Sequence, residues 1–245
     1  MITIYHRPRT LDEALTLLSR PNTVPLGGGT LLSTLKTDAV EAVDLQALGL
    51  NSLKKSGNNL EIGATVTLQQ LLESEPSPAA LKTALKLEAP LNIRNMATVA
   101  GTLVACDGRS TFATMLLAMD AKLSVTSNQS SVTSMGEFLP LRPRGLITGI
   151  IIPLNVRTAF EYVARTPSDK PIVCAALAQW NSGRTRLALG GYGKSPMLAM
   201  DGTEAEGIES AARNAFHEAA DEWASAEYRM EAAATLAKRC LGNLN

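Results

Sequence analysis

The chain has 245 residues, 45% of them hydrophobic, and its 23 basic and 23 acidic residues give a formal net charge of zero at pH 7. This length and apolar content predict a globular protein with a sizeable core rather than a disordered chain. The balanced charge leaves no basic field to attract nucleic acid, so we expect no nucleic-acid partner.

The sequence contains no run of about 18 apolar residues that would span a membrane. Its first residues lack the apolar core of a signal peptide, so we expect a cytoplasmic protein. The cysteines, Cys106, Cys174 and Cys240, are far apart in the sequence, and only two histidines are present. This pattern predicts no disulfide framework, metal site or iron–sulfur cluster in this chain.

Short strands and helices alternate over the first part of the chain. Apolar patterning predicts strands at residues 2–5, 23–27, 42–45, 60–64, 122–127 and 145–153, and helices at 10–20, 67–74, 77–89 and 111–121. Thr10 and Thr67 stand at N-cap positions, and Thr10 is spaced for a capping box with Glu13. Pro90 ends the third helix because its ring cannot continue it.

The pattern changes near residue 153, which predicts one domain at 1–155 and a second at 156–245. In the second domain we expect strands at 158–166, 172–180 and 185–191, the last two joined by the hairpin turn "NSGR". Helices are predicted at 206–221 and 225–241. We expect the last helix to begin at the cap Ser225, to hold an internal Glu–Arg pair and to end at Gly242.

The stretch "VPLGGGTLL", residues 24–32, places three glycines directly after a predicted strand. Because Gly27, Gly28 and Gly29 have no Cβ, a phosphate group can approach consecutive backbone N–H groups there. The alternative is a tight strand-to-helix turn. Leu32 stands where the dinucleotide-binding fingerprint needs glycine or alanine, so the loop does not match that fingerprint.

The stretch "NIRNMATVAGTL", residues 92–103, is the second unusual element. Thr98, Gly101 and Thr102 offer hydroxyls and backbone N–H groups to phosphate or ribityl oxygens. The alternative is a helix-breaking turn with a structural arginine, Arg94.

Two polar segments have competing interpretations. "CDGRST", residues 106–111, indicates a ligand-facing loop, unless Asp107 only caps the next helix. No histidine lies beside Cys106 as a base, which disfavours a nucleophilic cysteine. "RTPSDKP", residues 165–171, clusters Arg165, Asp169 and Lys170 as either a solvated surface or a functional loop.

The stretch "ALGGYGKSP", residues 188–196, looks like the end of an ATP-binding P-loop. Ala188 stands where that motif needs its first glycine, and Pro196 follows directly. We therefore favour a hairpin exit turn over an ATP-binding module.

Taken in order, six segments resemble the FAD-binding medium subunit of the xanthine dehydrogenase and carbon monoxide dehydrogenase family of molybdenum hydroxylases. They are "PLGGGTLL", "IGATVTLQQL", "IRNMATVAGTL", "LLAMDA", "ALGGYGKSP" and "SAEYRM". The resemblance spans nearly the whole chain. It implies an α+β fold, in which a two-subdomain FAD-binding domain of the PCMH type precedes a smaller domain of antiparallel strands and a helical bundle.

The resemblance also implies which residues hold FAD. In such subunits two glycine-containing loops hold the diphosphate and ribityl chain. Carried over, the residues are Leu26, Gly27, Gly28, Gly29, Thr30 and Leu31 on one side, and Thr98, Val99, Ala100, Gly101 and Thr102 on the other. Departures from the family pattern are Ala100 for glycine, Thr102 for asparagine, and Thr111 for an aspartate that meets the polar chain of the flavin. Asp169, in the loop that relatives place near the isoalloxazine, is retained.

The function implied is that of an oxidoreductase subunit. A large molybdopterin-binding subunit would carry out substrate hydroxylation, and a small subunit with two-iron two-sulfur clusters would pass electrons to FAD on this chain. The resemblance implies that the three kinds of subunit form a heterohexamer. FAD would deliver the electrons to an external acceptor. No general acid or base is required of this chain. The alternative is a structural subunit that has lost or weakened FAD binding, as the departures at Ala100, Thr102 and Thr111 suggest.

Overall fold

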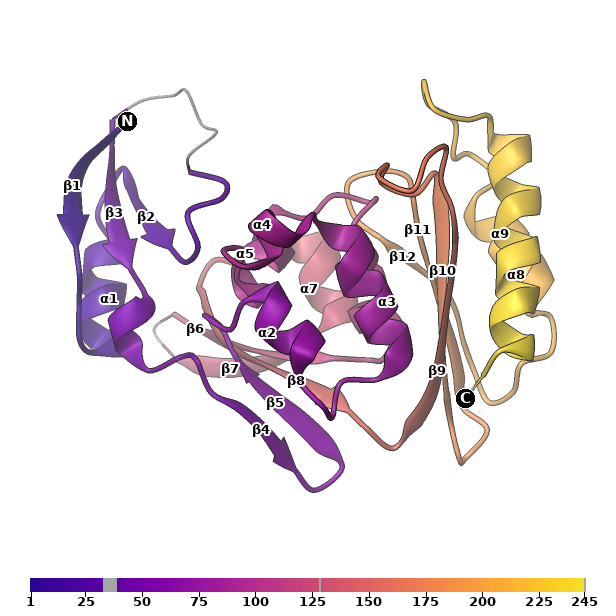
Figure 1. Ribbon diagram of the computed structural model, residues 1–245, viewed down its shortest axis with the longest axis horizontal. Coiled ribbons are helices and arrows are strands. Elements are labelled where there is room, and N and C mark those ends of the chain that lie inside the picture. The colour runs from indigo at the N-terminus through magenta and orange to yellow at the C-terminus, as the bar shows by residue number, and fades with distance from the viewer. Residues whose placement is uncertain (33–38, 128, 245) are drawn as a thin grey trace.

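The computed structural model describes residues 1–32, 39–127 and 129–244. Figure 1 shows an N-terminal part at the left, a middle part with most of the helices, and a C-terminal part at the right, in which helices α8 and α9 cover a sheet. The mixture of helices and largely separate sheets confirms the predicted α+β fold class.

The N-terminal part is a small parallel sheet with a covering helix. Its strands follow the order β1-β3-β2, and its elements are β1 (Ile2–His6), α1 (Leu11–Leu18), β2 (Thr23–Leu26), β3 (Val40–Asp44) and the 3₁₀ turn η1 (Gln46–Leu48). Thr10 caps α1 by accepting from Glu13 N, as predicted, but the Glu13 carboxylate accepts from Arg9 N rather than closing the box. The core of this part includes Val43 and, from the middle part, Leu146.

The middle part is an antiparallel sheet in the order β4-β5-β8-β6-β7, with helices packed against it. The strands are β4 (Leu53–Ser56), β5 (Asn59–Gly63), β6 (Lys122–Thr126), β7 (Ser130–Ser134) and β8 (Leu146–Pro153). The helices are α2 (Leu68–Glu73), α3 (Ala79–Glu88), α4 (Leu91–Arg94), α5 (Val99–Ala105), α6 (Thr111–Ala118) and α7 (Met135–Leu141). Thr67 and Gln70 form the capping box that starts α2.

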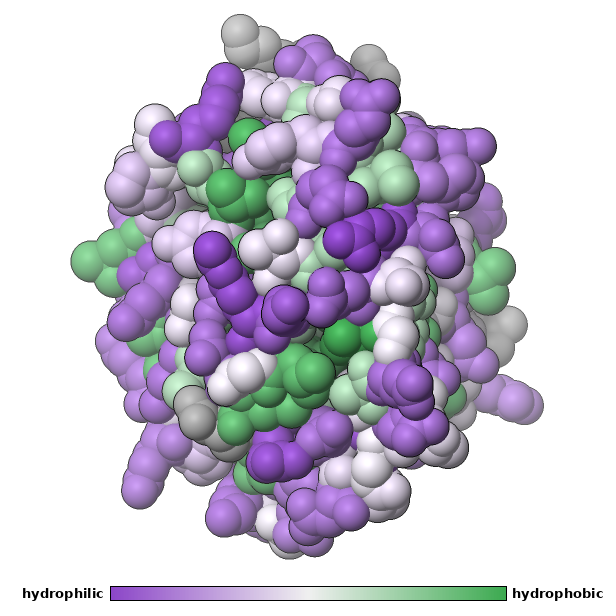
Figure 2. All heavy atoms as spheres, turned by 90° about the vertical axis from the view of Figure 1, so that its right-hand side faces the viewer, coloured by the Kyte–Doolittle hydropathy of each residue, from purple (hydrophilic) through white to green (hydrophobic). Residues whose placement is uncertain are grey.

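The C-terminal part is a sheet in the order β12-β11-β10-β9 followed by two helices. Its elements are β9 (Val156–Val163), β10 (Val173–Trp180), β11 (Thr185–Gly190), β12 (Met197–Gly202), α8 (Ile208–Ala215) and α9 (Ala226–Gly242). Side chains alternate along β10: Val173, Ala175 and Leu177 pack with α8 and α9, while Cys174 and Ala176 join the core of the middle part. The outward side of α8 and α9 is mostly hydrophilic, with small separate apolar areas (Figure 2).

The structure corrects three sequence-based expectations. Residues 92–103 are largely helical, since α4 and α5 lie there and the Thr98 hydroxyl caps α5. Gly242 is the last residue of α9, and Asn243 occupies the C-cap. Arg229, in the first part of the last helix, is fully buried and pairs with Asp221, outside the helix, rather than with a glutamate inside it.

The segment "ALGGYGKSP" connects β11 to β12, as expected for a hairpin exit turn. Gly191 and Gly193 have φ values of 121° and 80°, which favour glycine. The turn is tied to the middle part because Gly108 N donates to Gly193 O at 2.9 Å and Gly191 N donates to Gly108 O at 2.7 Å. Its backbone is therefore occupied by contacts within the protein.

Candidate functional site

A cavity of about 540 Å³ lies between the N-terminal and middle parts. Its walls come from the glycine loop after β2, from α5, from the end of α3, and from the start of β8. Apolar side chains supply much of the surface, among them Leu45, Leu68, Ile93 and Leu146. A cavity of this size and composition suits a small-molecule cofactor with one apolar and one polar portion.

The glycine loop packs directly against the segment that begins α5. A Cβ built on Gly28 would lie 1.6 Å from Met96 O, and one on Gly27 would lie 2.7 Å from Thr98 Oγ1. Gly29 has a φ of 73°, a conformation that side-chain-bearing residues rarely adopt. Glycine is therefore required at residues 27 and 28 by the contact between the two segments, and at residue 29 by the backbone conformation.

The backbone N–H groups of the two segments differ in whether they are already hydrogen-bonded within the chain. Within α5, Val99 N donates to Val66 O at 2.9 Å, Ala100 N to Ala64 O at 3.3 Å, and Gly101 N to Thr98 Oγ1 at 3.2 Å. By contrast, the N–H groups of residues 27–29 donate no hydrogen bond to the part of the chain that the structure describes. The glycine loop thus offers backbone donors to an anion, while α5 forms the opposite wall.

Most of the site residues expected from the sequence line this cavity. They are Gly27, Gly28, Gly29, Thr30, Leu31, Thr98, Ala100, Gly101 and Thr102. The Thr102 hydroxyl donates to Thr98 O at 2.9 Å. The Ala100 methyl group adds to the wall rather than closing the cavity.

Leu26, Val99, Thr111 and Asp169 lie outside the cavity lining. Leu26 ends β2, and Val99 is fully buried in the core of the middle part. Thr111 is 1% exposed, and its hydroxyl donates to Ala84 O at 2.7 Å. The Asp169 carboxylate pairs with Arg165 at 3.5 Å.

Two charged residues that the expected site did not include, Glu88 and Lys170, also line the cavity. Glu88 is the last residue of α3, where a helix dipole disfavours an acidic side chain, so its position was a signal in the sequence. Lys170 lies in the charged loop noted above, but the sequence alone does not show that this loop reaches the cavity.

Contacts with other segments hold the loop that carries Lys170. Arg109 Nη2 donates to Lys170 O at 2.6 Å, and the Lys170 ammonium lies 3.4 Å from the Asp107 carboxylate. The Trp223 ring lies 4.8 Å from the Arg109 guanidinium and 4.4 Å from that of Arg165. The aromatic ring therefore contacts Arg165 within the loop and Arg109, the residue that holds the loop at Lys170.

Cys106 lines the cavity but has the environment of a structural thiol. Burial raises the pKa of its thiol, although the nearby Arg142 guanidinium opposes that shift. The Cys106 Sγ donates to Leu103 O at 3.1 Å. A protonated thiol is a poor nucleophile, which supports the expectation that Cys106 is not a catalytic nucleophile.

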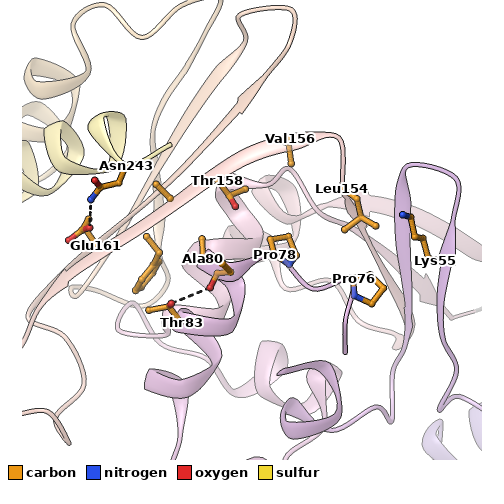
Figure 3. A pocket seen from close by; sticks show the side chains of 13 residues that line it. Lys55, Pro76, Pro78, Ala80, Thr83, Leu154, Val156, Thr158, Glu161 and Asn243 are labelled. Carbon is orange, nitrogen blue, oxygen red and sulfur yellow. Dashed lines mark hydrogen bonds between the residues drawn. The ribbon is translucent and has the colours of Figure 1, made fainter. Parts of the chain in front are cut away.

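A second pocket of about 590 Å³ lies between α3 and β9 (Figure 3). Pro76, Pro78 and Leu154 form much of its surface, and Lys55 and Glu161 lie at opposite ends in the view. Asn243 Nδ2 already donates to Glu161 Oε1 at 2.9 Å. This pocket offers no set of convergent donors comparable with the glycine loop.

The described residues form neither a cluster suited to a metal ion nor a helix suited to a membrane span. Within residues 1–32, 39–127 and 129–244, no group of three or more His, Cys, Asp or Glu residues is arranged to hold a metal ion. No helix in this part of the chain is long and apolar enough to cross a membrane.

The residues present fit a flavin nucleotide. Backbone donors on a loop without Cβ atoms suit a diphosphate, and the apolar walls suit a planar ring. Fold and cavity together define a flavin-nucleotide-binding protein of mixed α+β class. Residues 1–155 match the model of the FAD binding domain in molybdopterin dehydrogenase, so the chain belongs to this family and FAD is its cofactor.

Two known proteins are similar to this chain over most of its length. The uncharacterised protein YgfM of Escherichia coli K12 is 30% identical over 238 residues, covering 94% of this chain and 91% of YgfM. The glyceraldehyde dehydrogenase medium chain of Sulfolobus acidocaldarius is 30% identical over 219 residues, covering 80% of this chain and 78% of that protein.

A solved structure shows the same fold. A chain of the reconstituted CO dehydrogenase from Oligotropha carboxidovorans superposes with a TM-score of 0.83 at 24% identity, covering 98% of this chain and 96% of that chain. The agreement extends over the N-terminal, middle and C-terminal parts, because nearly the full length of both chains is aligned.

Proposed function

We propose that this chain is the FAD-carrying electron-transfer subunit of a molybdenum hydroxylase complex. The observation that carries the proposal is the cavity between the glycine loop and α5, in a chain whose residues 1–155 match an FAD-binding domain. When bound, FAD supplies the redox chemistry by accepting electrons from one partner and delivering them to another. The Sulfolobus relative is named as a medium chain, which supports a role beside other subunits.

The residues of this chain bind and orient the cofactor. The N–H groups of residues 27–29 donate to the diphosphate, and Thr98, Ala100, Gly101 and Thr102 form the facing wall. Thr30 and Leu31 continue the glycine loop along the cavity. The Lys170 ammonium adds positive charge at a site that otherwise relies on backbone dipoles.

No residue of this chain is assigned a proton-transfer role. Cys106 keeps its proton because burial raises its pKa. Substrate hydroxylation belongs to a large molybdopterin-binding subunit, and a small two-iron two-sulfur subunit supplies electrons. We propose that these subunits form a cytoplasmic heterohexamer. We also propose that this chain consists of two domains, residues 1–155 and residues 156–245.

The test is purification of the tagged chain from its own organism under mild conditions. We expect a large and a small partner to co-purify, with molybdenum and iron in the complex and one FAD for each copy of this chain. Anaerobic addition of the substrate of the complex should bleach the flavin absorbance. A chain that purifies alone, with neither partner nor metal, would contradict the proposal.

A further inference from the structure

Glu88 places a carboxylate in the cavity from an unusual position. It is the half-buried last residue of α3, where the negative end of the helix dipole disfavours an acidic group. Nothing in α3 itself explains an acid at this point. The contacts that hold Glu88 come from the beginning of α6.

One oxygen of the Glu88 carboxylate accepts hydrogen bonds from three consecutive residues. Oε2 accepts from Ser110 Oγ at 2.9 Å, from Thr111 Oγ1 at 3.1 Å and from Phe112 N at 2.9 Å. The start of α6 also provides a favourable dipole for a negative charge. The carboxylate is therefore fixed in place, with its charge compensated by one helix end.

The other oxygen, Oε1, has no hydrogen-bond donor among the described residues. Among the described residues that line the cavity, Glu88 is the only one with an acidic side chain. A fixed carboxylate repels phosphate but accepts hydrogen bonds from hydroxyl groups, and such charge-assisted bonds are the stronger kind. The portion of a ligand beside Glu88 should therefore carry hydroxyls rather than phosphate.

We propose that Glu88 is the residue that binds the hydroxyl groups of the flavin nucleotide, on either its ribityl chain or its ribose. This inference rests on the proposed function, because it names the chemistry of one end of the same cavity. Thr111 acts on the ligand only through Glu88, since its hydroxyl is shared between Ala84 O and the Glu88 carboxylate. Thr111 is thus a positioning residue.

The closeness of Thr111 to Glu88 provides a swap experiment. Dissociation constants for FAD are measured by fluorescence titration on the full chain, for wild type, for Glu88→Ala, and for Glu88→Ala combined with Thr111→Asp. We expect Glu88→Ala to weaken FAD binding by about 10- to 100-fold. The double variant should recover to within about threefold of wild type, because an aspartate at 111 would place a carboxylate near the lost one.

Two shorter ligands show which hydroxyls are bound. FMN has the ribityl chain without adenosine, and ADP has the adenosine ribose without the ribityl chain. Weaker FMN binding in Glu88→Ala with unchanged ADP binding assigns the ribityl chain, and the reverse assigns the ribose. Ser77→Ala is the matched control, because it removes a buried hydroxyl that donates to Leu71 O at 2.7 Å outside the cavity lining.

A folded Glu88→Ala variant with wild-type affinity for FAD would overturn the inference. If that variant does not fold, the double variant decides: wild-type affinity supports the inference, and folded protein with weak binding contradicts it. Failure of the proposed function looks different, because wild-type protein would then bind no FAD.

Discussion

Gly28 lies against the main-chain carbonyl of Met96, so closely that a Cβ at residue 28 would be 1.6 Å from the carbonyl oxygen. This contact joins the glycine loop of the N-terminal part to the segment preceding α5 in the middle part. It brings the N–H groups of the loop to the edge of the cavity. The geometry of the proposed diphosphate site therefore depends on a contact between residues far apart in the sequence.

The Gly28→Ala variant should lose most of its FAD affinity. The added methyl group cannot be accommodated beside the Met96 carbonyl, so the loop must move away from the segment that precedes α5. We expect a destabilisation of about 1–3 kcal/mol and FAD binding at least tenfold weaker, measured by urea unfolding and by fluorescence titration. Gly242→Ala is the control, because a Cβ there meets nothing within 4 Å. Equal FAD affinity in Gly28→Ala and wild type would contradict a role of this contact in binding FAD.

Lys170→Met should weaken FAD binding by about threefold to tenfold and reduce its dependence on salt. Among the described residues lining the cavity, Lys170 is the only one with a basic side chain, so its loss removes the positive charge that attracts the diphosphate. The measurement is a titration with FAD at low and high ionic strength. Lys194→Met is the matched control, since Lys194 belongs to the turn between β11 and β12. An equal effect of both variants would show that Lys170 has no specific role.

Asp221→Asn should destabilise the C-terminal part. Arg229 is fully buried, and its Nη2 donates to both Asp221 oxygens, at 2.8 and 2.9 Å. Removing the negative charge leaves a buried cation less well compensated, at a cost of about 1.5–3 kcal/mol in urea unfolding. Glu231→Gln, which affects the exposed pair with Arg213, should cause no measurable change. Unaltered stability of Asp221→Asn would show that backbone carbonyls alone satisfy Arg229.

The stabilisation that Asp201 provides should be lost in acid. Hydrogen bonding from Arg184 lowers the pKa of its carboxyl, with a further contribution from Arg186, against the opposing effect of burial. A pKa lowered in the folded state gives stability that is fully present above the ordinary aspartate value, about 3.9, and is lost as the pH falls through the folded value. The free energy of unfolding should therefore fall less steeply below about pH 4 in Asp201→Asn than in wild type.

Removing Arg184, one of the two arginine partners of Asp201, provides a second check on the acid dependence. Arg184 Nη2 lies 2.8 Å from Asp201 Oδ2, so Arg184→Met should flatten the same part of the stability profile. Identical slopes in wild type and both variants would show that Asp201 does not contribute to acid sensitivity.

Local signals explain which elements could be predicted from the sequence. Thr10, Thr67 and Ser225 each accept from a backbone N–H in the first turn of their own helix, so the cap and its partner are neighbours. Strand β7, "SSVTS", has no apolar alternation, and α5 is short and contains a glycine. Such elements are determined by packing with distant segments rather than by their own pattern.

The site could be predicted only in part for the same reason. Three adjacent glycines are visible in the sequence, and they do line the cavity. That the first-turn amides of α5 are already bonded depends on Ala64 and Val66, which belong to another segment. The position of Glu88 depends in turn on the start of α6.

The FAD content of the purified wild-type chain tests the central claim most directly. We expect one FAD for each chain, either bound on purification or restored by adding FAD to flavin-free protein, as measured by the absorbance of oxidised flavin against protein concentration. Protein that is folded but neither contains nor takes up FAD would contradict the account, and would favour a structural subunit that has lost its flavin.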